Sequence, residues 1–133
     1  MLTSYDDFIN AAQEQAEPQR LLFVFAKAEM PESPTEEQKQ RYLEGEGGYL
    51  DPVLCVDKLP EEVQSFESLL AESAETGKNW DIAFAASMSG LIGIAPTTEQ
   101  AEQPLKMMVE SIKGGNIANF LAFNRRGELL QIL

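Results

Sequence analysis

The chain contains no histidine and a single cysteine, Cys55. Without an imidazole, it cannot form a Ser-His-Asp triad, a Cys-His pair or a histidine-ligated metal site. One thiol per chain excludes an internal disulfide, a Cys-x-x-Cys redox motif and a multi-cysteine metal cage. We therefore predict no catalytic residue, no metal ligand and no cofactor. Any remaining chemistry would have to use carboxylates, lysine, hydroxyls or the backbone, so enzymatic activity stays open, and we favour a protein that is not an enzyme.

Long hydrophobic runs are also missing. The two longest, Leu21–Ala26 and Ile82–Ala86, are far shorter than the roughly 20 residues that a membrane-spanning helix requires. The N-terminal segment 1–8 has no basic leader, no apolar stretch and no small-residue cleavage site, which are the features of a secretory signal. We expect a cytoplasmic protein that does not span a membrane.

Basic residues are scarce. The chain has 10 lysines and arginines against 22 acidic residues, which gives a formal net charge of −12. A field of this sign repels phosphate backbones and anionic lipid surfaces, so we expect neither nucleic acid nor membrane as a partner. The acidity fits a specific basic partner, but it equally fits a small protein that is kept in solution by its charge.

The composition is otherwise that of one globular domain. The chain has 133 residues, of which 44% are apolar and 24% charged, close to average usage for a folded domain. A chain of this length forms one hydrophobic core rather than two. We therefore predict a single domain over residues 1–133.

Apolar spacing and turn signals predict alternating helices and strands. The expected helices cover residues 4–17, 35–44, 60–76 and 97–113, and the expected strands cover 21–26, 53–56, 80–88, 117–123 and 128–132. This order indicates an α/β or α+β fold, a single layered domain in which helices pack on a mixed sheet of about five strands. Two strand-helix-strand units favour parallel crossovers, and the chain ends in a β-hairpin.

Two segments have features of their own. Residues 30–48 are the most polar stretch and end in Gly45-Glu46-Gly47-Gly48, so we expect them to be the most mobile. Pro104 lies inside the last predicted helix, where it should cause a kink or separate a short first turn from the main helix.

Five stretches of the chain carry a resemblance to a known family. They are LLFVFAKAEMP, GEGGYLDPVLCVDK, NWDIAFAASMSG, PTTEQAEQPLKMM and FLAFNRRGELLQ. Together they resemble a family of short bacterial proteins that often carry the label "ribonucleotide reductase subunit alpha". A catalytic reductase subunit needs a redox-active cysteine pair and a further cysteine, so Cys55 alone cannot support that label. The resemblance therefore implies at most an accessory partner of such an enzyme.

The best candidate for a ligand site is the junction between the third strand and the last helix, residues 87–98. A strand-to-helix loop with glycines can present backbone N–H groups and the positive end of a helix to an anion. Asp57 and Lys58 end the preceding strand, and ligands of α/β folds gather where parallel strands end. The predicted ligand-binding residues are Asp57, Lys58, Ser87, Ser89, Gly90, Gly93, Thr97 and Thr98.

Each part of this site has a simpler explanation. The junction matches neither Walker A nor Gly-x-Gly-x-x-Gly and is also typical of an ordinary connection. Asp57 or Lys58 could merely cap the next helix. Cys55, between two apolar residues of a strand, should be a buried and inert thiol.

Three functional hypotheses remain open. The first is a non-enzymatic interaction or regulatory protein with a protein partner. The second is a small-ligand or nucleotide-binding domain that uses residues 87–98, as an accessory to nucleotide metabolism. The third, compatible with either, is a homo-oligomer that pairs through the edge of the C-terminal hairpin.

Overall fold

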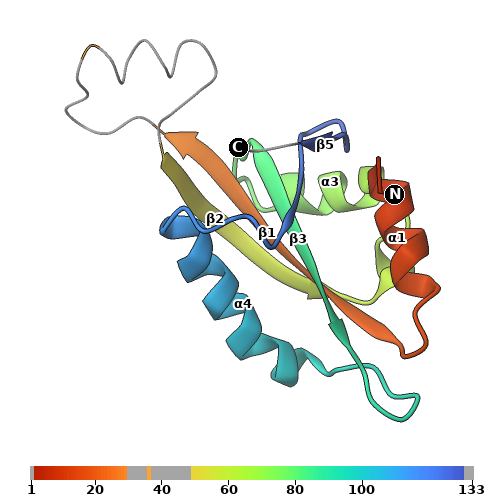
Figure 1. Ribbon diagram of the computed structural model, residues 1–133. Coiled ribbons are helices and arrows are strands. Elements are labelled where there is room, and N and C mark those ends of the chain that lie inside the picture. The colour runs from red at the N-terminus through yellow and green to blue at the C-terminus, as the bar shows by residue number, and fades with distance from the viewer. Residues whose placement is uncertain (1, 30–35, 37–48, 131–133) are drawn as a thin grey trace.

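The computed structural model describes residues 2–29, 36 and 49–130 (Figure 1). The short helix and the mobile segment expected within residues 30–48 lie outside the described residues, as does the end of the last predicted strand. No helix among the described residues is both long and apolar enough to cross a membrane.

The described chain forms helices packed on a five-stranded sheet, with the strand order β2-β1-β3-β4-β5. The elements in chain order are α1 (Tyr5–Gln13), β1 (Gln19–Glu29), β2 (Tyr49–Lys58), the 3-10 helix η1 (Pro60–Glu62), α3 (Phe66–Glu75), β3 (Ile82–Ser89), α4 (Thr98–Lys113), β4 (Leu121–Phe123) and β5 (Leu129–Leu130). The predicted fold class, a single layered domain that mixes helices with a five-stranded sheet, is confirmed.

The expected parallel crossovers are wrong, because every described strand pair is antiparallel. The connection through η1 and α3 leads from β2 to β3, but these two strands lie on opposite sides of β1 rather than next to each other. A helix between two strands in the sequence therefore does not make those strands neighbours. Apolar periodicity shows that a strand is buried, but it does not show which strand lies beside it.

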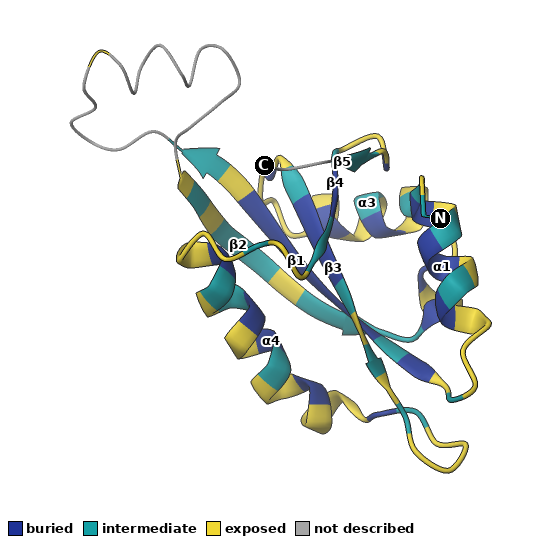
Figure 2. Cartoon of the chain, in the orientation of Figure 1, coloured by how far each residue is buried: buried dark blue, intermediate teal, exposed yellow. Residues whose placement is uncertain are grey.

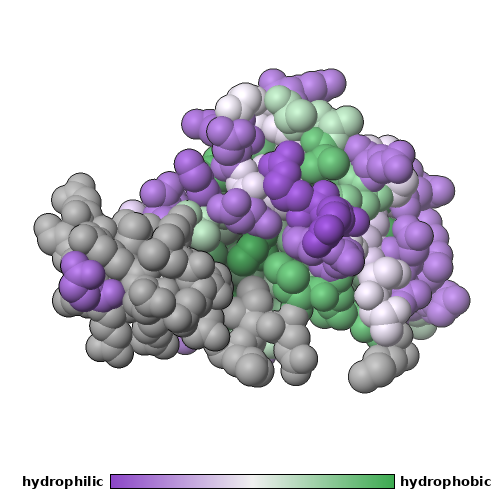
Figure 3. All heavy atoms as spheres, turned by 90° about the horizontal axis from the view of Figure 1, so that it is seen from above, coloured by the Kyte–Doolittle hydropathy of each residue, from purple (hydrophilic) through white to green (hydrophobic). Residues whose placement is uncertain are grey.

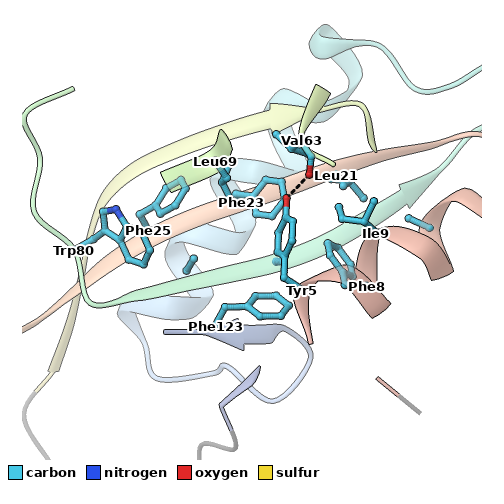
Figure 4. Close-up of a cluster of buried hydrophobic side chains, with 13 residues drawn as sticks. Tyr5, Phe8, Ile9, Leu21, Phe23, Phe25, Val63, Leu69, Trp80 and Phe123 are labelled. Carbon is cyan, nitrogen blue, oxygen red and sulfur yellow. Dashed lines mark hydrogen bonds between the residues drawn. The ribbon is translucent and has the colours of Figure 1, made fainter. Parts of the chain in front are cut away.

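β1 is buried on both faces, as its apolar run predicts. Its side chains alternate between two clusters, because successive residues of a strand point to opposite faces of the sheet. Leu21, Phe23 and Phe25 pack with α1, η1 and α3 (Figure 4). Leu22 and Val24 pack under α4 on the other face. Figure 2 shows the buried residues along β1 and on the helix surfaces that face the sheet.

The hydropathy of the surface agrees with this arrangement. Seen from the end of the sheet at which β5 lies, hydrophilic residues occupy most of the described outer surface, and hydrophobic residues gather toward the middle of the molecule (Figure 3). The described residues thus form one layered body with a continuous sheet and two packed faces.

The predicted helix 60–76 is divided into η1 and α3. Val63 lies between them and is fully buried. Ser65 is the N-cap of α3: its hydroxyl accepts a hydrogen bond of 3.2 Å from the backbone N–H of Ser68. The predicted strand 80–88 begins later, at Ile82. Pro104 does not divide α4, which is one helix from Thr98 to Lys113.

Tyr5 joins α1 to η1 through the core. Its ring is 2% exposed, and its hydroxyl donates a hydrogen bond of 2.7 Å to the carbonyl oxygen of Val63 (Figure 4). Burial raises the pKa of this hydroxyl well above its usual range, and the carboxylates of Asp6 and Glu72 raise it further. The folded state therefore keeps the Tyr5 proton at pH values at which an unfolded chain has lost it.

We expect this linkage to make the free energy of unfolding fall as the pH rises above about 10, the ordinary pKa of tyrosine. The contribution of Tyr5 is complete below that pH, because the hydroxyl is protonated in both states there. Tyr5→Phe should cost about 1 kcal/mol at pH 8 through the lost hydrogen bond, but should lose less stability than the wild type between pH 9 and 11.5. Urea unfolding of both proteins, followed by circular dichroism at pH 9 and at pH 11.5, measures how much stability each protein loses; the same measurement at pH 8 gives the cost of the substitution. An equal alkaline loss in the two proteins would contradict the linkage.

Candidate functional site

The chain makes a tight turn between β3 and α4. The backbone N–H of Leu91 donates to the carbonyl oxygen of Ile94 at 2.9 Å, and the N–H of Ile94 donates back to that of Leu91 at 3.1 Å. The two residues between them have positive φ angles, 52° for Ile92 and 75° for Gly93. Positive φ at both central positions is the pattern of a type I′ turn. The turn is therefore a compact, hydrogen-bonded unit.

Two further hydrogen bonds hold this turn to the connection between α1 and β1. The N–H of Gly90 donates to the carbonyl oxygen of Pro18 at 2.8 Å. The N–H of Gly93 donates to the Glu17 carboxylate, also at 2.8 Å. A Cβ atom on Gly90 would overlap with the carbonyl oxygen of Ile94, so this position requires glycine for space. The turn has a fixed orientation relative to the sheet.

The tip of the turn is apolar and exposed. Leu91 is 74% exposed, Ile92 83% and Ile94 71%. Figure 2 shows this turn as an exposed extension beyond the end of β3. Ile92 is β-branched, and such residues rarely adopt a positive φ because of steric strain. The fold thus combines an unfavourable backbone conformation with three solvated aliphatic side chains. We call Leu91–Ile94 the aliphatic tip.

The threonines that follow the turn are engaged within the protein. Thr97 caps α4: its hydroxyl accepts from the N–H of Gln100 at 3.0 Å, and the Gln100 side chain accepts from the N–H of Thr97 at 2.9 Å. Thr98 donates to the Asp57 carboxylate at 2.8 Å, and Arg20 forms an ion pair with the same carboxylate oxygen at 2.7 Å. These contacts connect β1, β2 and the start of α4.

An anion is a poor fit at this helix start. Asp57 and Glu99 place two carboxylates beside it, and Arg20, the nearby cation, is bonded to Asp57 and to the carbonyl oxygen of Pro96. The positive end of a helix favours negative charge, but here the protein's own carboxylates, those of Asp57 and Glu99, already lie near it. The electrostatics of the junction therefore do not resemble those of a phosphate site.

The remaining predicted residues lie on the other face of the sheet. Ser87 donates to the Gln19 side chain at 2.7 Å, and Gln19 donates to Ser89 at 3.1 Å. Lys58 forms an ion pair with Glu72 of α3 at 2.9 Å. Lys58 and Ser87 both pair with Leu21, whose side chain packs with α1 and α3, whereas Asp57 pairs with Leu22, which packs under α4.

The eight predicted ligand-binding residues therefore do not all meet in one site. Ser89, Gly90 and Thr97 line one hollow beside the turn, and Gly93 lies within the turn. Asp57 and Thr98 contact each other at the start of α4, whereas Lys58 and Ser87 lie on the face covered by α1 and α3. Among the residues that the structure describes, no group of three or more cysteine, aspartate and glutamate side chains could hold a metal ion.

A groove lies between β2 and α4, and the sequence did not predict it. The groove has a volume of about 990 Å³ and is lined by Cys55, Asp57, Thr98, Glu99, Glu102, Leu105, Lys106, Val109 and Glu110. Cys55 is exposed, so the expectation of a buried thiol is wrong. The reason is that β2 is an edge strand, so its side chains are covered less completely than those of β1.

Comparison with protein-family models, curated proteins and solved structures finds no match to this chain. Its function is therefore inferred from the residues and geometry described above.

Proposed function

We propose that this chain is a non-enzymatic interaction protein that binds a protein partner through the aliphatic tip, Leu91–Ile94. The observation that carries this proposal is the exposure of Leu91, Ile92 and Ile94, each above 70%, on a turn fixed by backbone hydrogen bonds. Scattered single apolar residues are common on protein surfaces, but contiguous exposed apolar groups mark interaction sites. The partner should offer an apolar pocket to this tip.

The energetics favour such a contact. Burying one leucine or isoleucine side chain contributes about 1.5–3 kcal/mol, so burial of all three would give several kcal/mol at one small contact. The tip is already ordered, because it is bonded to Pro18 and Glu17, and a preformed contact loses little conformational entropy on binding. The strain at Ile92 has no evident benefit to folding, which supports a role in binding.

A small-ligand site at the same junction is a second candidate. A hollow of about 570 Å³ lies beside the turn, with Ser89, Gly90 and Gln100 among its lining residues. This volume is in the range of small-molecule sites, although the hydroxyls of Ser89 and Thr97 have partners within the protein. A nucleotide that binds there would raise the melting temperature of the chain by mass action. An accessory role toward a ribonucleotide reductase would instead make that enzyme the protein partner.

The test of the proposed function starts from crosslinking. A photoreactive phenylalanine analogue at position 92 should crosslink a specific protein in cells, whereas the same analogue at Glu67, an exposed position of α3, should not. The captured protein is then purified, and its affinity for the chain is measured by calorimetry. This second step is needed because crosslinking alone does not establish a specific contact.

We expect Ile92→Asn to separate binding from stability. Asparagine tolerates a positive φ better than isoleucine, so the variant should be more stable than the wild type by about 1 kcal/mol. The same substitution removes the most exposed aliphatic side chain and should weaken binding of the captured partner at least tenfold. Urea unfolding and calorimetry measure the two effects. Unchanged affinity in Ile92→Asn, and in a variant that also carries Leu91→Ser and Ile94→Ser, would refute the proposed function.

A further inference from the structure

β2 forms an open edge of the sheet in the described part of the chain. It is a strand of ten residues, and its partner within the described sheet is β1 alone. The outer side of such a strand presents backbone N–H and C=O groups that can pair with another extended chain. Pro52 removes one N–H near the start of β2, so the stretch from Val53 onward is the better template.

The groove described above lies along this edge. α4 runs beside β2 (Figure 1), and the two elements contact each other. Leu105 and Val109 supply apolar side chains from α4, and Cys55 is exposed on β2. Along α4 the lining of the groove extends from Thr98 to Glu110, roughly 18 Å at 1.5 Å per residue, which corresponds to about five residues of extended chain. The groove is therefore long enough for a short strand.

The charge of the groove sets the chemistry of its occupant. Four carboxylates line it, against one ammonium group, that of Lys106. The Asp57 carboxylate is paired with Arg20. Along α4, the Glu102 carboxylate lies 4.0 Å from the Lys106 ammonium group and that of Glu110 lies 3.7 Å from the Lys113 ammonium group, but these pairs are long and exposed, so they contribute little and can be exchanged for a basic ligand. Glu99 adds a further carboxylate to the groove. A chain of net charge −12 reinforces this negative field. A second copy of this chain is disfavoured, because it would bring two acidic grooves together.

We propose that this groove binds an extended segment of a partner protein in which lysine or arginine alternates with small apolar residues. The segment adds as a strand to β2, with its basic side chains on the α4 side. Their methylene groups cover Leu105 and Val109, and their charged ends reach Glu102 and Glu110, as long basic side chains do on apolar surfaces with an acidic rim. The alternate side chains lie on the other face, near Leu54 and Val56, which are partly buried there.

The probe is the synthetic peptide acetyl-Thr-Lys-Val-Lys-Val-Lys-Thr-amide, titrated into the whole chain labelled with ¹⁵N at low ionic strength. We expect amide shifts in β2 and along α4 and a measurable Kd. Two control peptides isolate the two parts of the proposal. Glutamate in place of lysine should abolish binding through charge, and N-methylation of all three lysines and both valines should abolish it by removing the N–H groups that pair with β2, whichever direction the peptide runs.

A matched pair of variants tests the location. Glu102→Lys with Glu110→Lys reverses two charges in the groove and should raise the Kd about tenfold. Glu14→Lys with Glu67→Lys makes the same change in net charge at two exposed positions, the C-cap of α1 and α3, and should raise the Kd by less than threefold. Circular dichroism of both variants shows whether the fold is retained.

Several outcomes would overturn the proposal. These are equal binding of the glutamate peptide, amide shifts confined to elements other than β2 and α4, or equal weakening by the two double variants. A dimer in sedimentation experiments whose β2 amides are protected without peptide would assign the edge to a second copy instead. The triple substitution in the aliphatic tip should leave peptide binding unchanged, so the groove and the tip fail or succeed independently.

Discussion

Gly90→Ala should lower the free energy of unfolding by about 3 kcal/mol, the largest effect that we expect from adding a single methyl group to this chain. The added Cβ would overlap with the carbonyl oxygen of Ile94 and would lie 2.8 Å from that of Pro18. Both are backbone atoms, so no flexible side chain can move away to make room. Relief requires the turn to separate from the connection between α1 and β1. Urea unfolding measures the loss.

Gly93→Ala is the matched control for this prediction. Gly93 has a positive φ of 75°, but a Cβ atom there would meet no atom within 4 Å. The cost should therefore be that of the left-handed backbone alone, about 1 kcal/mol. Equal losses in the two variants would mean that Gly90 is not held against Pro18 and Ile94, and the fixed orientation of the aliphatic tip would lose its main support.

Trp80→Ala should destabilise the chain by about 3–5 kcal/mol. Trp80 is 2% exposed, and its ring centroid lies 5.0 Å from that of Phe25. Its indole N–H donates to the hydroxyl of Ser73 at 2.9 Å. Arg125 lies over the same ring at 4.7 Å and donates to the Trp80 carbonyl oxygen. One side chain therefore connects β1, α3 and the turn before β5.

Trp80→Phe separates packing from hydrogen bonding at this position. It keeps an aromatic ring against Phe25 but removes the donor to Ser73, whose own hydroxyl still donates to the carbonyl oxygen of Leu70. We expect a loss of about 1–2 kcal/mol. Because Trp80 is the one tryptophan in the sequence, circular dichroism rather than fluorescence must follow unfolding. Similar losses for phenylalanine and alanine would show that the hydrogen bond, not the ring, dominates.

Local signals in the sequence predicted the element types well. Ser4 and Thr97 cap α1 and α4 at the starts predicted for these two helices, because a side-chain oxygen placed before a helix finds its backbone N–H partner within three residues. The apolar run of β1 likewise predicted a strand buried on both faces. These features depend on neighbours in the sequence, so the sequence contains all the information that they need.

Strand pairing and exposure could not be predicted in the same way. Cys55 was expected to be buried because Leu54 and Val56 flank it, but its exposure depends on β2 lying at the edge of the sheet. Asp57 and Lys58 point to opposite faces because they are successive residues of a strand, but which helices cover each face follows from the pairing with β1. Both properties are set by contacts between segments far apart in the chain, and periodicity within one segment does not record them.

The candidate site shows the same limit. The junction 87–98 was correctly recognised as a strand-to-helix connection, but its glycines drew attention to backbone N–H groups and anions. The signal that was present and overlooked is the succession of Leu91, Ile92 and Ile94 around Gly93. Large aliphatic residues in a turn without burial are unusual, and the geometry of the turn was needed to show that all three are exposed.

The central position of β1 has a consequence for biosynthesis. This strand leaves the ribosome well before β3, one of its pairing partners: Gln19 pairs with Ser89, 70 residues later. Until β3 has been synthesised, the segment Leu21–Ala26 remains an uncharged, β-prone stretch without its final cover, which is the kind of sequence that aggregates. Nascent chains that stall before β3 should therefore depend on chaperones more than the finished protein does.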